Sequence, residues 1–180
     1  MRDKILKSKC LHINLSNHAT EILCDVTISG PEDFKNEHGV KCTGVWDTGS
    51  EGCLISPELA EKLNLILISY KIVVGVTGEQ ISPEYLINLF LPNGDSFEGI
   101  STLVGNRLAE DEFIIGMSII NEGDFAITNV NNKTTMSFRS PSVARINFEL
   151  EYEKAKAEEE VINRRQQKAT KRNQKRRKRK

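Results

Sequence analysis

The stretch Val45-Trp46-Asp47-Thr48-Gly49-Ser50 decides how this sequence is interpreted. The apolar residues before Asp47 predict a strand that would hold its carboxylate in a fixed place. Gly49 permits a tight turn and a close approach of another backbone, and Ser50 adds a hydroxyl donor beside the acid. Asp-Thr-Gly alone occurs by chance in many proteins, so its meaning depends on the elements around it.

Short strands separated by turns are predicted on both sides of this stretch. Ile22, Cys24, Val26 and Ile28 alternate with polar residues, which is typical of a half-buried strand. Residues 92–95 (Pro-Asn-Gly-Asp) predict a hairpin turn, because Asn-Gly tolerates positive φ. The predicted strands are residues 11–15, 22–28, 42–46, 67–76, 84–91, 96–104 and 113–115, followed by a last hairpin of 125–128 and 134–138.

Two short helices are predicted within this β-rich region. Ser56 can cap the first one and Pro57 suits its first position, with Leu59, Ala60 and Leu63 following at helical spacing. The second helix would follow Gly116 and end at Gly123. The predicted fold is therefore mostly β, a closed, antiparallel, barrel-like sheet with one or two short helices.

The formal net charge of zero conceals two oppositely charged regions. Residues 164–180 contain 11 Lys or Arg and no acid, which leaves 14 basic against 25 acidic residues in the rest of the chain. Residues 144–161 are rich in Glu, Lys and Ala, which favour helix. We therefore expect a domain of residues 1–142, a helical linker of 143–163 and a basic, disordered tail of 164–180.

The sequence contains no segment of the length and apolarity that a membrane helix needs. The first residues (MRDKILKSKC) lack the apolar core of an export signal, so a cytoplasmic location is expected. Cys10, Cys24, Cys42 and Cys53 are then expected to be reduced thiols, and their spacing matches no zinc ligand set. A metal site at Cys10 and His12 is a minor alternative.

The order of three elements resembles the retropepsin-like family of aspartic proteases, including its bacterial and other non-viral members, across residues 11–138. Asp47 to Ser50 matches the Asp-Thr/Ser-Gly-Ala/Ser loop, and residues 74–78 (Val-Gly-Val-Thr-Gly) match a flap hairpin. Residues 114–116 (Ile-Ile-Gly) match the apolar pair and glycine that precede a short helix. Ser118 stands where many relatives have Asp, and the flap has fewer glycines than in viral members.

The resemblance implies a homodimeric endopeptidase, because the chain contains a single Asp-Thr-Gly. Asp47 would lie next to Asp47 of a second copy, and the two carboxylates would share a proton and activate a water molecule. By resemblance, Thr48 would bond across to the other loop, Gly49 would line the substrate backbone, and Ser50 would bond the outer carboxylate oxygen. This chemistry requires no metal or other cofactor.

The resemblance also implies where a peptide or protein substrate would bind. An extended peptide would lie between the catalytic loops and the flaps. The expected substrate-binding residues are Gly49, Val74, Gly75, Val76, Thr77, Gly78, Ile114 and Ile115. Core packing is the alternative role for the apolar members of this set.

Other interpretations compete with catalysis. The domain could be a catalytically silent module for peptide binding or dimerisation, with a nucleic-acid-binding tail. Residues 164–180 could contact nucleic acid or another polyanion, remain a solvated terminus or address segment, or pair with the acidic residues 158–160. A Cys-His protease based on Cys53 is a weakly supported alternative, since no His follows His38 in the sequence.

Overall fold

The computed structural model describes residue 5 and residues 7–75, 78–106, 108–109 and 112–177, with side chains as far as residue 168. The chain divides into two compact units, Met1–Val143 and Ala144–Lys180. This division falls one residue from the predicted domain end at 142. The two units are described separately below.

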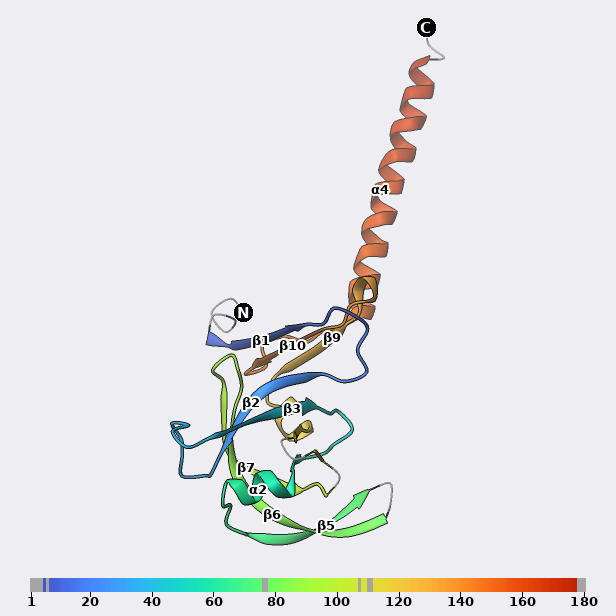
Figure 1. Ribbon diagram of the computed structural model, residues 1–180. Coiled ribbons are helices and arrows are strands. Elements are labelled where there is room, and N and C mark those ends of the chain that lie inside the picture. Colours follow the sequence, from blue (N-terminus) through green and yellow to red (C-terminus); the bar gives the residue numbers. More distant parts are fainter. Residues whose placement is uncertain (1–4, 6, 76–77, 107, 110–111, 178–180) are drawn as a thin grey trace. The chain divides into compact units, whose positions relative to one another are not determined.

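The first unit is built mainly from strands (Figure 1). Within the described residues they are β1 (Lys9–Asn14), β2 (Leu23–Ser29), β3 (Val40–Trp46), β4 (Cys53–Ile55), β5 (Ser69–Gly75), β6 (Gly78–Phe90), β7 (Ser96–Val104), β8 (Glu112–Ile115), β9 (Asp124–Thr128) and β10 (Thr135–Ser140). The predicted strands all lie within or next to these. β4, which has only three residues, was not predicted.

Six of the strands close into a barrel. They pair in the order β2-β3-β8-β4-β7-β6, and β6 pairs back onto β2. β5 pairs with β6 alone and forms the free edge of this sheet. The predicted mostly β, closed barrel is confirmed, although the β3–β8 and β4–β7 pairings are parallel rather than antiparallel.

The core lies inside the barrel and beneath a second sheet of order β1-β10-β9. Ile28, Ile55, Ile87 and Phe113 have no exposed surface, and burial of each such side chain contributes about 1.5–3 kcal/mol. Trp46 joins the two sheets, because its ring lies 5.5 Å from that of Phe125 and 5.0 Å from that of Phe138. The strand that leads into Asp47 is thereby held against both sheets.

Local sequence signals account for the turns. Gly94 has a φ of +78° in the β6–β7 hairpin, where Leu91 N donates to Asp95 O at 2.8 Å. The β9–β10 connection contains the 3-10 helix η1 (Val130–Asn132), in which Asn131 and Asn132 have positive φ. Both predicted hairpins are confirmed.

Two short helices complete the unit. In α2 (Pro57–Lys62) the Ser56 hydroxyl accepts from Leu59 N at 3.1 Å, as predicted. α3 (Met117–Ile120) begins after Gly116 and is shorter than the predicted segment, because Asn121 already closes its last turn.

The second unit contains α4 (Phe148–Arg177), a single helix of 30 residues. The helix continues beyond the expected linker of 143–163 into residues 164–177 of the expected tail. Arg, Lys and Gln predominate there, and these straight-chain residues lose little rotamer freedom in a helix. Glu149 and Glu151 lie in the first turn, where they favour helix through its dipole.

Candidate active site

Asp47 follows directly after β3 and is fixed by backbone hydrogen bonds. Its N–H donates to Ile115 O at 3.1 Å, which extends the β3–β8 ladder by one residue. The Gly49 N–H donates to Asp47 Oδ1 at 2.8 Å, and Ser50 N donates to Asp47 O at 3.3 Å. The carboxylate therefore has a defined orientation and accepts a hydrogen bond from its own loop.

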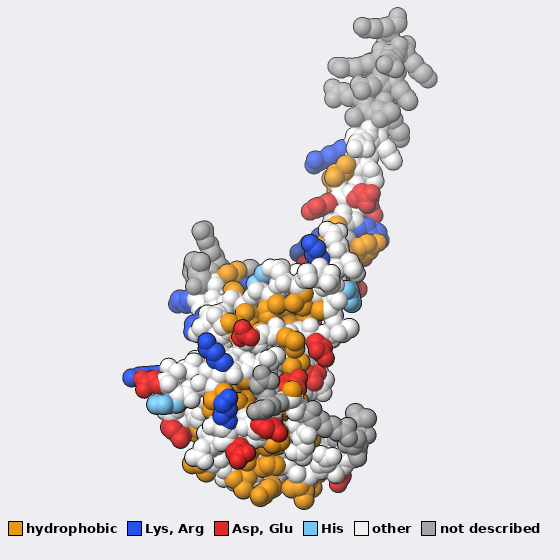
Figure 2. Space-filling view, viewed as in Figure 1, with side chains coloured by type: hydrophobic (Ala, Val, Ile, Leu, Met, Phe, Trp, Pro, Cys, Tyr) orange, Lys and Arg blue, Asp and Glu red, His pale blue; other side chains and the backbone are white. Residues whose placement is uncertain are grey.

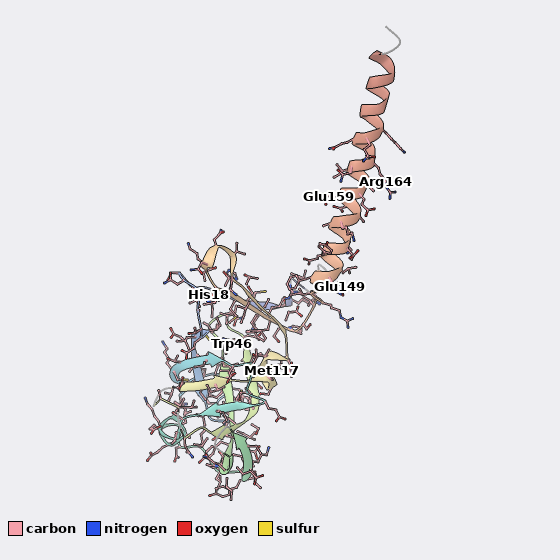
Figure 3. All side chains as sticks on the ribbon, turned by 90° about the vertical axis from the view of Figure 1, so that its right-hand side faces the viewer. His18, Trp46, Met117, Glu149, Glu159 and Arg164 are labelled. Atoms are coloured by element: carbon pink, nitrogen blue, oxygen red, sulfur yellow. The ribbon has the colours of Figure 1, made fainter. Side chains whose placement is uncertain are left out.

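Gly116 brings the loop after Asp47 against the start of α3. A Cβ on Gly116 would lie 2.0 Å from Gly52 O and 2.9 Å from Ser50 O, so no side chain fits there. Met117 N donates to Ser50 O at 2.8 Å, and Ser118 N donates to Glu51 O at 3.0 Å. Figure 3 labels Trp46 and Met117, which flank this junction. Sequence analysis singled out both segments, and the fold brings them together.

The loop itself is open to solvent in the single chain. Thr48 and Gly49 are exposed, whereas Asp47 and Ser50 are half-buried. The Ser50 hydroxyl donates to Gly52 O at 2.7 Å. The expected bond from Ser50 to the outer carboxylate oxygen is therefore not formed, because the hydroxyl closes the turn of its own loop.

Strand register shows which side chains share a sheet face with Asp47. Directly paired residues lie on the same face, and residues two apart on a strand do so too. Asp47 thus shares its face with Val45, which pairs with Ile114. Ile114 pairs in turn with Leu54, and Leu54 pairs with Leu103. These four side chains are half-buried or, for Ile114, 8% exposed. They form an apolar row beside the acid.

The row bears on two of the residues predicted to bind substrate. Ile115 cannot line a groove, because it pairs beside Trp46 on the opposite, core-facing side and has no exposed surface. Ile114 does lie in the row, together with Val45, Leu54 and Leu103, which the sequence did not single out. In the sequence these residues alternate with core residues along their strands. Only the register of strand pairing shows that they share one sheet face with Asp47.

The predicted flap is a hairpin of β5 and β6 in which Gly75 pairs with Gly78. Gly78 has a φ of +104°, which L side chains rarely adopt. Val76 and Thr77, predicted to contact substrate, lie outside the described residues. Val74 is 76% exposed on the face opposite to the apolar row, so register assigns Val73 to the Asp47 side instead.

The other face of this hairpin is apolar and exposed. Tyr70, Ile72, Val74 and Ile81 are each between 64% and 76% exposed. Figure 2 shows hydrophobic side chains at the end of the domain where β5 and β6 lie.

A charged cluster lies at the base of the hairpin. Lys71 Nζ is 2.6 Å from Glu84 Oε1, and the hydroxyls of Ser69 and Ser101 donate to the Glu84 carboxylate. These hydrogen bonds, that from Lys71 foremost, lower the pKa of Glu84 to about 2. Glu84 is therefore a carboxylate at any pH near neutrality.

Cys53 lacks the surroundings of a catalytic nucleophile. Cys53 is 1% exposed and burial raises the pKa of its thiol, which opposes formation of a nucleophilic thiolate. Its Sγ lies 3.6 Å from Ser118 Oγ rather than beside a His. His12, for its part, is hydrogen-bonded through Nδ1 to Ser137 Oγ at 2.7 Å.

Two features of the described residues bear on the setting of the candidate site. They contain no group of three or more His, Cys, Asp or Glu arranged to hold a metal ion. They also contain no helix long and apolar enough to cross a membrane.

Comparison with known proteins found similarity in structure but not in sequence. No family model matches the chain, and no curated protein matches it. The similar solved structures include a bacterial retropepsin-like aspartic protease and retroviral proteases, which is the resemblance expected from the sequence. At this level the similarity concerns the fold and not catalysis.

Three of these structures illustrate the similarity. A retropepsin-like aspartic protease from Rickettsia conorii is 18% identical, with a TM-score of 0.46 over 74% of this chain and 95% of that one. The EIAV protease is 14% identical, with a TM-score of 0.43 over 56% of this chain and 86% of that one. The simian foamy virus protease is 16% identical, with a TM-score of 0.40 over 55% of this chain and 91% of that one.

Proposed function

We propose that the chain is one subunit of a homodimeric aspartic endopeptidase in which Asp47 pairs with Asp47 of a second copy. The observation that carries this proposal is the loop from Asp47 to Gly52. It is held by Ile115 and α3 through backbone bonds, yet it leaves Thr48 and Gly49 exposed. A loop that is fixed but uncovered is suited to meet a symmetry-related copy of itself.

Pairing of the two loops supplies the missing half of the catalytic machinery. Two carboxylates about 3 Å apart cannot both ionise easily, so the pair retains one proton. The ionised carboxylate takes a proton from a bound water, and this water attacks the scissile carbonyl. The protonated carboxyl group donates a hydrogen bond to the carbonyl oxygen. Thr48 of each copy then bonds to the opposite loop and keeps the carboxylates in register.

The sheet face that carries Asp47 is the proposed floor for an extended peptide. Val45, Ile114, Leu54 and Leu103 offer apolar contacts beside the acid, and the β5–β6 hairpin covers the peptide from above. We therefore propose substrates with apolar side chains next to the scissile bond. The main-chain groups of the peptide would bond to the hairpin and to Gly49.

The direct test is cleavage of a diverse peptide library by purified protein across acidic to neutral pH, with Asp47→Asn as the matched control. The proposal predicts defined cleavage sites that vanish in the control. Cleavage that survives in Asp47→Asn, or none by the folded, dimeric wild type at any pH, would refute catalysis. In the second case a silent peptide-binding module would fit better.

The basic end of the chain has a separate proposed role in binding a polyanion such as nucleic acid. Residues 164–180 hold 11 basic residues and no acid, and α4 presents part of them on a regular helix. Each Lys or Arg near a phosphate releases counterions, so affinity should fall steeply with salt. Removal of residues 164–180 should abolish binding to a duplex oligonucleotide at low salt; unchanged affinity would refute this role.

A further inference from the structure

The apolar row beside Asp47 ends in a charged pair. Leu103 pairs directly with Glu84, and Glu84 pairs with Ser69, so Glu84 continues the row on the same sheet face. The Glu84 side chain is 10% exposed and that of Lys71 is 54% exposed. A peptide lying along this face would therefore meet the Lys71 ammonium before it met the carboxylate.

The hydrogen bonds within the cluster use three of the roughly four acceptor sites of the Glu84 carboxylate, whereas the Lys71 ammonium keeps unused donors. Glu84 Oε1 already accepts from Lys71 and Ser101, and Oε2 accepts from Ser69. An ammonium group has three N–H donors. In the part of the chain that the structure describes, Glu84 is the one partner of the Lys71 ammonium, so N–H donors remain for a further acceptor.

The electrostatics favour an acidic ligand over a basic one. A ligand carboxylate bonded to Lys71 lies nearer to the ammonium than to Glu84, and attraction decreases with distance, so the nearer charge dominates. A basic ligand would have to reach a carboxylate that is only 10% exposed and would meet repulsion from the Lys71 ammonium. The cluster thus presents a positive group on the sheet face that carries Asp47.

We propose that Lys71 is a specificity-determining residue that selects an Asp or Glu side chain in the substrate, and that Glu84 is the positioning residue that holds the ammonium in place. This inference rests on the proposed function, since it requires a peptide on the face that carries Asp47. It narrows the substrate class to peptides with apolar residues at the scissile bond and an acid a short distance along the chain.

The test compares cleavage profiles of a peptide library for wild type, Lys71→Met and Lys71→Glu. Lys41→Met is the matched control, because Lys41 is also an exposed Lys and lies at the start of β3, at the end away from Asp47. Wild type should prefer Asp or Glu over Lys at one fixed position by about tenfold in kcat/KM, as for one hydrogen bond to a charged group. Lys71→Met should lose this preference, Lys71→Glu should reverse it, and Lys41→Met should retain it.

The variant Glu84→Gln tests whether Glu84 positions the Lys71 ammonium or only stabilises the fold. It should raise KM for acidic peptides relative to neutral ones, whereas a merely structural defect would affect both alike. A wild-type profile without acidic preference, or the same preference in Lys71→Met, would overturn the inference.

Binding measurements distinguish failure of this inference from failure of the proposed function. If the wild type cleaves nothing, matched acidic and basic peptides are titrated against Asp47→Asn and Asp47→Asn/Lys71→Met by fluorescence anisotropy. Selective binding that depends on Lys71 would support the subsite while the endopeptidase proposal fails. Equal binding of both peptides would overturn the subsite as well.

Discussion

Substitution of Gly116 by Ala should disrupt the candidate active site by steric overlap alone. Gly116 has a φ of −86° and a ψ of −173°, which any residue adopts, so the backbone conformation gives no penalty. The added methyl would lie 2.0 Å from Gly52 O and 2.6 Å from Gly52 C. Both atoms are backbone, so neither can rotate away as a side chain could.

The expected loss of stability follows from this overlap. Overpacking of a well-packed site costs about 1–3 kcal/mol. Movement of the loop also weakens the bonds from Met117 N to Ser50 O and from Ser118 N to Glu51 O, each worth about 1 kcal/mol. We expect a decrease of about 2–4 kcal/mol in the free energy of unfolding, together with loss of peptidase activity because Asp47 moves with the loop.

Urea unfolding followed by circular dichroism measures this change. Gly52→Ala is the matched control, because a Cβ on Gly52 has nothing within 4 Å and no positive φ is recorded there. It should unfold within about 0.5 kcal/mol of wild type, as for an ordinary surface substitution. If Gly116→Ala is as stable as Gly52→Ala, the claim that the loop packs closely against the start of α3 is refuted.

Two further predictions concern pH and thiol reactivity. The pKa of Glu84 is lowered from an ordinary 4.5 to about 2 in the folded chain, so its stabilising effect is complete above about pH 4.5 and is lost as the pH falls towards 2. Glu84→Gln should therefore flatten the pH dependence of the free energy of unfolding, measured with urea, in that window. An unchanged slope would contradict the hydrogen bonding of the Glu84 carboxylate in this cluster. Cys10 is exposed whereas Cys42 and Cys53 are buried, so intact mass after iodoacetamide treatment should show Cys10 alkylated first and Cys42 and Cys53 only on unfolding. Alkylation of Cys53 in the folded protein would contradict the burial of its side chain.

Sequence reasoning identified the features whose signals are local. The Asn93-Gly94 turn, the Ser56 cap and the strand leading into Asp47 each depend on a few adjacent residues with definite backbone preferences. The three-element pattern also singled out Gly116 as the glycine that precedes a short helix. The structure adds the physical reason, which is that Gly52 and Ser50 leave no room for a side chain at that position.

Features that depend on pairing could not be obtained in the same way. Val73 and Val74 are chemically alike in the sequence, and only the register with Gln80 and Glu79 shows which one lies on the Asp47 side. The row of Val45, Leu54 and Leu103 comes from strands that are distant in sequence. The helical course of residues 164–177 is not evident from the sequence for a different reason: a dense run of like charges is typical of disorder, although Arg, Lys and Gln each favour helix.

The most direct test of the central claim is the activity of mixed dimers. Wild type and Asp47→Asn are unfolded together, refolded in varied ratios and assayed on one cleaved peptide. A shared site in which both copies contribute an acid predicts activity proportional to the square of the wild-type fraction, about one quarter at an equal mixture. Activity that falls in direct proportion to the wild-type fraction would mean that each chain acts alone, and would contradict the paired Asp47 account.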